Sequence, residues 1–131
     1  MRKIGILLLA ALLLTGCGKS GENKPAGEEK AYMNITAEEA KKLMDTEQDY
    51  VILDVRTREE YEAGHIPGAL LLPNTEIRDR AESELKNKDQ LILIYCRSGN
   101  RSKQASEILE ELGYTRIREF GGINDWPYDV E

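Results

Sequence analysis

Two nearly continuous apolar runs, each of strand length, constrain the fold of this chain more than any other feature. The runs lie at Tyr50–Val55, which only Asp54 interrupts, and at Leu91–Tyr95. A strand that is apolar along its whole length is covered on both faces, which is typical of a parallel sheet between two layers of helices. The two runs therefore predict a fold of the α/β class.

Helix signals alternate with these runs and with shorter strand signals. Thr36 with Glu39, and Thr57 with Glu60, have the spacing of capping boxes, and Gly64 ends the second, short helix. After the second run, apolar residues recur with helical spacing up to Gly113, namely at Ala105, Ile108, Leu109 and Leu112. Further strands are predicted at residues 32–35, 69–72 and 115–120, and Asn74 is expected to cap a helix. This alternation predicts one α/β sandwich.

The first 16 residues have the order of an export signal. Arg2 and Lys3 precede an apolar run at residues 4–14 that only Gly5 interrupts, and small residues follow it. The run is too short for a membrane-spanning helix, which needs about 20 apolar residues. Residues 14–17, Leu-Thr-Gly-Cys, resemble the lipobox of bacterial lipoproteins. That resemblance implies that Cys17 becomes the mature N-terminus and carries acyl chains such as palmitate.

An acylated Cys17 predicts an exported protein that is lipid-anchored to the cell membrane, facing the periplasm or the cell exterior, because several buried acyl chains hold stably. The alternative is a plain secretory signal with an incidental cysteine. Residues 17–31 are interpreted as the lipidated cysteine and a flexible tether, because residues 18–31 are rich in glycine and charge and contain no aromatic or β-branched residue.

The remaining residues, 32–131, are enough for one domain with one core. Without Arg2 and Lys3, 16 Lys and Arg face 24 Asp and Glu, which gives a net charge of −8 and argues against non-specific nucleic-acid binding. Cys17 and Cys96 lie in such different surroundings that the sequence predicts no disulfide framework. We expect a monomer.

The strongest candidate for chemistry is a cysteine at a strand end. Cys96 follows the second apolar run and precedes a predicted helix, and the residues next to it are Arg97, Ser98, Gly99, Asn100 and Arg101. A helix N-terminus, two arginines and small residues that let N–H groups turn inward all favour an anion and lower the pKa of a thiol. This pattern predicts a nucleophilic Cys96 thiolate. The alternative is a buried cysteine that acts as a small hydrophobe.

Four motifs, taken in order, resemble a single-domain rhodanese over residues 33–131. They are residues 52–56 (ILDVR), 64–69 (GHIPGA), 96–102 (CRSGNRS) and 121–123 (GGI) before Trp126. The resemblance implies a three-layer sandwich with about five strands in a mainly parallel sheet and helices on both faces. It also implies transfer of sulfane sulfur from a small anionic donor such as thiosulfate to a thiol or cyanide acceptor.

The resemblance assigns roles to individual residues. It implies that Cys96 carries the sulfur as a persulfide, with no separate cofactor, and that the N–H groups of residues 97–101 cradle the transferred sulfur. Arg97 is the expected anion-binding side chain, and Arg101 closes the loop. Asp54 and Arg56 end a neighbouring strand, so we expect them in the same crevice, where they support the loop.

Other functions remain open at this stage. Related folds use a cysteine loop in phosphatases and arsenate reductases, but phosphatases of this architecture have five residues between cysteine and arginine, and only four separate Cys96 from Arg101. A non-catalytic docking module at the cell envelope is a further alternative. His65, the only histidine, is interpreted as a structural residue near a tight turn. One histidine and one unmodified cysteine are too few for the usual zinc sites, so no metal is expected.

Overall fold

The computed structural model describes residues 30–131, so the predicted signal segment, Cys17 and most of the predicted tether lie outside the described residues. Strands and helices alternate along this part of the chain. In order, the elements are β1 (Tyr32–Asn34), α1 (Ala37–Thr46), β2 (Tyr50–Asp54), α2 (Arg58–Ala63), β3 (Leu70–Leu71), η1 (Asn74–Glu76), α3 (Ile77–Glu84), β4 (Leu91–Cys96), α4 (Asn100–Glu111), β5 (Ile117–Gly122) and η2 (Ile123–Asp125). No helix within residues 30–131 is long and apolar enough to cross a membrane.

The five strands form a single parallel sheet in the order β1-β5-β4-β2-β3. This confirms the predicted α/β class and the predicted number of strands. β4 lies in the middle and is buried at all six of its positions, which explains why its sequence is apolar throughout. The first strand, β1, pairs with β5, which is the last strand. The first and last strands in sequence are therefore neighbours in the sheet.

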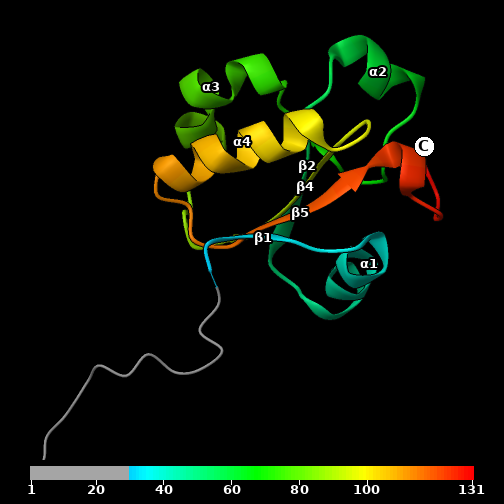
Figure 1. The fold of residues 1–131 in the computed structure, drawn as a ribbon, viewed down its shortest axis with the longest axis horizontal. Helices are drawn as coiled ribbons and strands as arrows, with labels where there is room; N and C mark the ends of the chain where they lie inside the picture. The colour runs from blue at the N-terminus through cyan, green and yellow to red at the C-terminus, as the bar shows by residue number, and fades with distance from the viewer. Residues whose placement is uncertain (1–29) are drawn as a thin grey trace, which may run out of the picture.

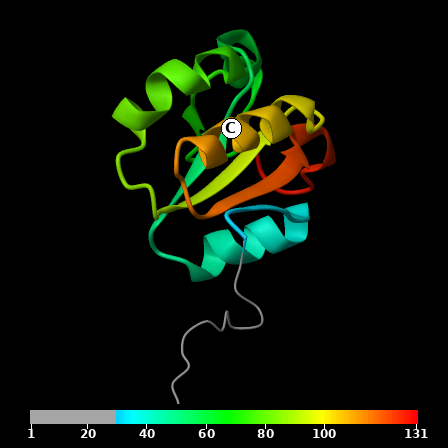
Figure 2. The same ribbon diagram turned by 60° about the vertical axis from the view of Figure 1, so that its left-hand side comes forward.

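Helices cover both faces of the sheet, as Figures 1 and 2 show. α3 and α4 pack on one face and α1 on the opposite face, so the domain has three layers. Each face has its own cluster of buried apolar side chains, because successive residues of a strand point to opposite sides. The cluster on the α1 side includes Tyr95, Phe120 and Trp126, whose rings follow one another at centroid distances of 5.5 and 5.4 Å.

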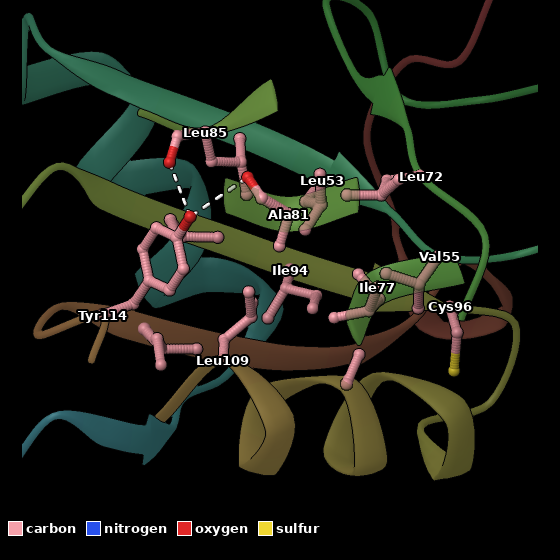
Figure 3. Packing of buried hydrophobic residues seen from close by; sticks show 13 residues of the cluster. Leu53, Val55, Leu72, Ile77, Ala81, Leu85, Ile94, Cys96, Leu109 and Tyr114 are labelled. Atoms are coloured by element: carbon pink, nitrogen blue, oxygen red, sulfur yellow. Dashed lines mark hydrogen bonds between the residues drawn. The ribbon is translucent and has the colours of Figure 1, made fainter. Parts of the chain in front are cut away.

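Figure 3 shows the cluster on the face that α3 and α4 cover. The Tyr114 hydroxyl lies 3.1 Å from the carbonyl oxygen of Ala81 and 2.6 Å from that of Leu85, so the phenol ties the end of α3 to the segment before β5. Cys96 lies at the other end of this cluster, beside the first turn of α4. Burial of each large aliphatic side chain in such a cluster contributes about 1.5–3 kcal/mol. The candidate reactive cysteine is therefore attached to one of the two buried clusters of the domain.

Both predicted capping boxes are present. The Thr36 side chain accepts a hydrogen bond from the Glu39 N–H and the Glu39 side chain accepts one from the Thr36 N–H, and Thr57 and Glu60 make the same pair of contacts. The strand bounds differ from those predicted at the sheet ends. β3 contains only two residues of the predicted 69–72, and β5 begins two residues later than predicted and continues through two glycines.

The prediction that Asn74 caps a helix is wrong. Asn74 is the first residue of the 3-10 turn η1, and α3 begins at Ile77 without a side-chain cap. The Asn74 N–H donates to the carbonyl oxygen of Val55 at 2.9 Å, and its side-chain amide donates to Gln104 at 3.2 Å. The residue therefore attaches this turn to the segment that follows β2 and to α4.

Candidate active site

Cys96 is the last residue of β4, and its sulfur lies inside the turn that leads into α4. The residue is 1% exposed, and it is the only free cysteine among residues 30–131. Gly99 has a φ of +119°, a conformation that is costly for a side chain with Cβ, and this lets its N–H point back to the Cys96 sulfur at 3.0 Å. The loop therefore provides a backbone donor aimed at the sulfur, as the glycine in the motif predicts.

The surroundings of the sulfur favour the thiolate. Burial raises the pKa of the Cys96 thiol, but hydrogen bonds from the Ser102 hydroxyl and from the backbone N–H groups of Ser102, Gly99 and Ser98 outweigh burial, so that the pKa is lowered below its usual value. A thiolate is the nucleophilic form of cysteine. The loop therefore holds Cys96 in a state suited to nucleophilic attack.

A buried polar chain lies under the loop. The Cys96 sulfur is 3.3 Å from the Ser102 hydroxyl, which also donates to one carboxylate oxygen of Glu119. That oxygen accepts a second hydrogen bond from the Gly121 N–H at 2.9 Å, and the other carboxylate oxygen accepts one from the Asn34 amide at 2.6 Å. Glu119 is 1% exposed. A carboxylate from β5 and an amide from β1 thus reach the cysteine through one hydroxyl.

The loop rests directly on β5 at Gly122. A Cβ added to Gly122 would lie 1.9 Å from the carbonyl oxygen of Arg97 and 2.5 Å from the nitrogen of Ser98. Gly122 has extended backbone angles, so the close approach, and not the backbone conformation, requires glycine here. The Asn124 N–H donates to the same carbonyl oxygen of Arg97 at 3.2 Å. The second glycine of the Gly-Gly motif therefore places the cysteine loop on the sheet.

Arg101 does not point at the sulfur as an uncompensated charge. Its guanidinium forms a two-pronged ion pair with Glu60, at 2.7 and 3.0 Å, and joins the start of α4 to the start of α2. The hydrogen bond from Arg101, with the Thr57 N–H as a further donor, lowers the pKa of Glu60 to about 2. Arg101 therefore links α4 to α2 through Glu60.

Asp54 and Arg56 form a buried ion pair at the end of β2. The Arg56 guanidinium donates to Asp54 at 2.7 Å and to the carbonyl oxygen of Gly64, also at 2.7 Å. Asp54 accepts a hydrogen bond from the Tyr95 hydroxyl at 2.6 Å, and burial raises the pKa of that phenol. The pair thus contacts the residue before Cys96 and the segment after α2, and neither member is hydrogen bonded to residues 97–101.

A pocket of about 480 Å³ opens beside the loop. Arg56, Glu60, Arg97 and Asn124 line its polar side, and its apolar side is formed by Ala63, Ile123, Trp126, Tyr128 and Val130. Arg97 is exposed, and among residues 30–131 no acid forms an ion pair with it. Because the arginines at 56 and 101 are paired with acids, Arg97 is the lining residue whose positive charge is available to a bound anion.

His65 lies away from the sulfur. Its ring stacks on Tyr61 with centroids 3.8 Å apart, and its Nδ1 is 2.9 Å from the carbonyl oxygen of Tyr61. Its other ring nitrogen is 3.6 Å from Glu131. These contacts give His65 a structural position in the turn after α2. Within residues 30–131, no group of three or more His, Cys, Asp or Glu side chains is placed to hold a metal ion.

Sequence reasoning did not identify Ser102 and Glu119 as site residues, nor Glu60 as the partner of Arg101. A glutamate in a strand carries no signal of burial, and Glu60 is already explained as part of a capping box. Only the three-dimensional proximity of β5 and α4 brings Ser102 and Glu119 together under the sulfur. Only the structure shows that Arg101 is paired with an acid, whereas Arg97 forms no ion pair within residues 30–131.

Comparisons with known proteins identify similar sequences and similar folds. The sequence model of the Rhodanese-like domain family matches residues 36–128. Thiosulfate sulfurtransferase PspE of Escherichia coli strain K12 is 38% identical over 73 residues, which are 56% of this chain and 70% of that protein. Putative sulfur carrier protein YrkF of Bacillus subtilis strain 168 is 36% identical over 125 residues, which are 95% of this chain and 64% of that protein. A solved structure described as a rhodanese with anions from E. coli has a TM-score of 0.59 and 34% identity, and the match covers 63% of this chain and 96% of that one.

Proposed function

The chain belongs to the rhodanese-like domain family, and from that premise we propose that it is a sulfurtransferase of the rhodanese type with Cys96 as its sulfur carrier. The observation that carries the proposal is the position of the Cys96 sulfur, which is held within its own loop by the Gly99 N–H at 3.0 Å and has a lowered pKa. A similar protein is named a thiosulfate sulfurtransferase and another a putative sulfur carrier protein. Both names are consistent with a persulfide-forming cysteine.

The proposed reaction has two steps. In the first, the Cys96 thiolate attacks the sulfane sulfur of thiosulfate, a sulfur–sulfur bond forms to Cys96, the bond to the sulfonate sulfur breaks, and sulfite leaves with the electron pair. In the second, a thiolate or cyanide attacks the outer sulfur, and Cys96 leaves as a thiolate. Neither step requires a metal or a separate cofactor.

The loop is suited to carry an anionic outer sulfur. The N–H groups of Arg97, Asn100 and Arg101 have no acceptor among the described residues, because they belong to the turn and to the first turn of α4. Free N–H groups at a helix start stabilise negative charge. Arg97, the available cation beside the pocket, is the side chain that we propose for binding the anionic donor. This local positive charge acts although the whole chain is acidic.

The spacing from Cys96 to Arg101 disfavours the phosphatase and arsenate reductase alternatives. Only four residues separate them, and Arg101 is bound to Glu60 in a two-pronged ion pair. A phosphatase needs donors that reach the oxygens of the transferred phosphoryl group. We therefore propose sulfur as the transferred group.

We also propose that the domain acts at the cell envelope, anchored through acyl chains on Cys17, as the signal-like segment and the lipobox resemblance suggest. Separation of cells into soluble and membrane fractions tests this part by itself. The wild-type protein is expected in the membrane fraction, and Cys17→Ala is expected to leave it. Equal distribution of both proteins would contradict the anchor and leave the proposed chemistry untouched.

Mass measurement of the full chain tests the chemistry. After incubation with thiosulfate, the wild-type protein should gain one sulfur atom, and peptide mapping should place this sulfur on Cys96. Cys96→Ser should show neither the gain nor the formation of thiocyanate from thiosulfate and cyanide, whereas Cys17→Ala should show both. Normal turnover by Cys96→Ser would refute the proposal, and inactivity of the wild-type protein with several sulfane donors would favour a docking module.

A further inference from the structure

The sulfur-transfer steps do not use Glu119, although only the Ser102 hydroxyl separates its carboxylate from the reactive sulfur. Glu119 is 1% exposed, and within residues 30–131 no lysine, arginine or histidine forms an ion pair with it. Its partners are neutral donors, namely the Asn34 amide, the Gly121 N–H and the Ser102 hydroxyl. Buried carboxyl groups without a cation partner depend strongly on the hydrogen bonds that they accept.

The Ser102 hydroxyl is shared between two acidic groups. Its oxygen lies 3.3 Å from the Cys96 sulfur and within hydrogen-bond distance of Glu119, and the neutral carbonyl oxygens of Gly99 and Gly121 lie 3.0 and 3.3 Å from it. A hydroxyl has one hydrogen and can donate it to only one strong acceptor at a time. When Cys96 is a thiol, its S–H can donate to Ser102, and Ser102 can donate to Glu119, so every group is satisfied. When Cys96 is a thiolate, the sulfur and the carboxylate compete for the same hydrogen.

From this competition we propose that Glu119 is a positioning residue that acts through Ser102: by holding the hydrogen of the Ser102 hydroxyl, it sets the pH at which Cys96 becomes a thiolate. The thiolate gains the Ser102 hydroxyl as a donor, beside its backbone donors, only when Ser102 turns its hydrogen from Glu119 to the sulfur. One oxygen of Glu119 then keeps only the Gly121 N–H. The thiolate and the Glu119 carboxylate therefore compete for the one hydrogen of Ser102.

The same hydrogen bond also favours the sulfur-loaded state. Once Cys96 carries a second sulfur, its own sulfur atom has two covalent bonds and no charge, and the negative charge lies on the outer sulfur. Ser102 can then donate to Glu119 again. Glu119 thus lowers the fraction of unloaded Cys96 that is a thiolate and does not destabilise the persulfide. A smaller thiolate fraction limits oxidation of the unloaded cysteine.

Other charged groups near the pair lie farther along the same elements. Arg101 on α4 is bound to Glu60, and its positive charge acts on the cysteine. On β1, burial raises the pKa of Tyr32, and the charge of Glu119 raises it further. Arg118 precedes Glu119 on β5, and its guanidinium donates to backbone carbonyl oxygens near the start of the described chain. Two acids of α4 face Tyr32, namely Glu107 and Glu110.

Titration of the thiolate by its ultraviolet absorbance tests the proposal without any sulfur donor. The full chain is used, and Cys96→Ala serves as the baseline that subtracts Cys17. Glu119→Gln keeps the size of the side chain but removes the negative charge that holds the Ser102 hydrogen. The titration of Cys96 should therefore move to lower pH, with roughly tenfold more thiolate on its acidic side.

A second background decides whether Ser102 mediates the effect. Ser102→Ala alone should move the titration to higher pH, because the thiolate loses a donor. In the Ser102→Ala background, the further change Glu119→Gln should have no effect on the titration. A shift of equal size in both backgrounds would show that the charge of Glu119 acts directly and would overturn the proposal, as would an unchanged titration in Glu119→Gln.

Asn34→Ala keeps the test decisive if Glu119→Gln fails to fold. Asn34 is exposed on β1, and its loss removes a donor from the other carboxylate oxygen. With one donor fewer, the carboxylate should hold the Ser102 hydrogen more firmly, so the Cys96 titration should move to higher pH, and an unchanged titration would refute the role of Glu119. The proposal uses the proposed function only in treating Cys96 as the reacting group. The titration needs no sulfur transfer, so it can refute the role of Glu119 without refuting the proposed sulfurtransferase function, and the reverse also holds.

Discussion

Gly122→Ala is the substitution for which the structure gives the most direct prediction. The added methyl group would lie 1.9 Å from the carbonyl oxygen of Arg97, 2.2 Å from its carbonyl carbon and 2.5 Å from the nitrogen of Ser98. All three are backbone atoms, so no side chain can rotate away to make room. Gly122 has extended backbone angles that alanine also adopts, so the whole effect is steric.

The size of the effect follows from the displacement. Ordinary contacts of a Cβ begin at 3.4 Å, so the loop must move away from β5 by about 1.5 Å. This movement breaks the hydrogen bond from Asn124 to Arg97 and shifts the turn that holds the Cys96 sulfur. Misplacement of a reacting group by about 1 Å can cost about 100-fold in rate, and overpacking typically costs about 1–3 kcal/mol of stability. We expect losses of both sizes in Gly122→Ala.

Two measurements check the prediction. Formation of thiocyanate from thiosulfate and cyanide gives kcat/KM, and urea denaturation followed by circular dichroism gives the free energy of unfolding. Gly68→Ala is the matched control, because Gly68 has a φ of +85° but open space around its Cβ position. It should lose about 1–2 kcal/mol through backbone strain and keep its transfer rate. A Gly122→Ala protein with wild-type kcat/KM would refute the argument that β5 places the loop.

Three further predictions concern stability, each measured by urea denaturation. Glu60→Gln should lower the free energy of unfolding by about 1–2 kcal/mol at pH 7, allowing for solvent screening of its ion pair with Arg101. Because folding lowers the pKa of Glu60 from 4.5 to about 2, this stabilisation is present above pH 4.5 and is lost as the pH falls toward 2, where the two proteins should converge. Asp54→Ala should cost about 3–5 kcal/mol, because it leaves Arg56 buried without its partner. Tyr114→Phe should cost about 1 kcal/mol, because it removes the hydroxyl that binds carbonyl oxygens of α3.

Controls separate these effects from general damage. Glu62→Gln, at an exposed position of the same helix as Glu60, should leave stability unchanged at both pH values. A constant difference between Glu60→Gln and the wild type from pH 7 to pH 2 would contradict the ion-pair explanation. A cost below about 1 kcal/mol for Asp54→Ala would show that Arg56 reaches water in the variant.

Much of the fold could be predicted from the sequence because its signals are local. The continuous apolar runs at β2 and β4 predict central parallel strands, and the spacing of Thr36 with Glu39 identifies a helix start without any tertiary information. Asn74 was misjudged because a 3-10 turn of three residues comes before α3, so that Asn74 opens this turn and lies too far from the first residues of the helix to cap it. The ends of β3 and β5 were misplaced because pairing with a neighbouring strand, and not local propensity, decides where a strand begins and ends.

Part of the candidate site could likewise be predicted from the sequence, and part could not. Cys96 and its loop have a local signature, namely a buried strand followed by small and basic residues, so their identification requires only the sequence. The roles of Glu119 and Gly122 depend on distances to residues more than 15 positions earlier in the chain. Such contacts leave no periodic pattern. The part of the site that holds the loop is therefore visible only in three dimensions.

The position of β5 has a consequence for the order in which the site is assembled. Glu119 and Gly122 belong to the last strand, which enters the sheet between β1 and β4. During synthesis, Cys96 therefore emerges before the residues that place its loop and share the hydrogen of Ser102. The donors of the Cys96 sulfur belong to the loop and to α4, but the loop itself rests on Gly122 and accepts a hydrogen bond from Asn124, which follow in the chain. Insertion of β5, the strand made last, therefore completes the support on which the loop around Cys96 rests.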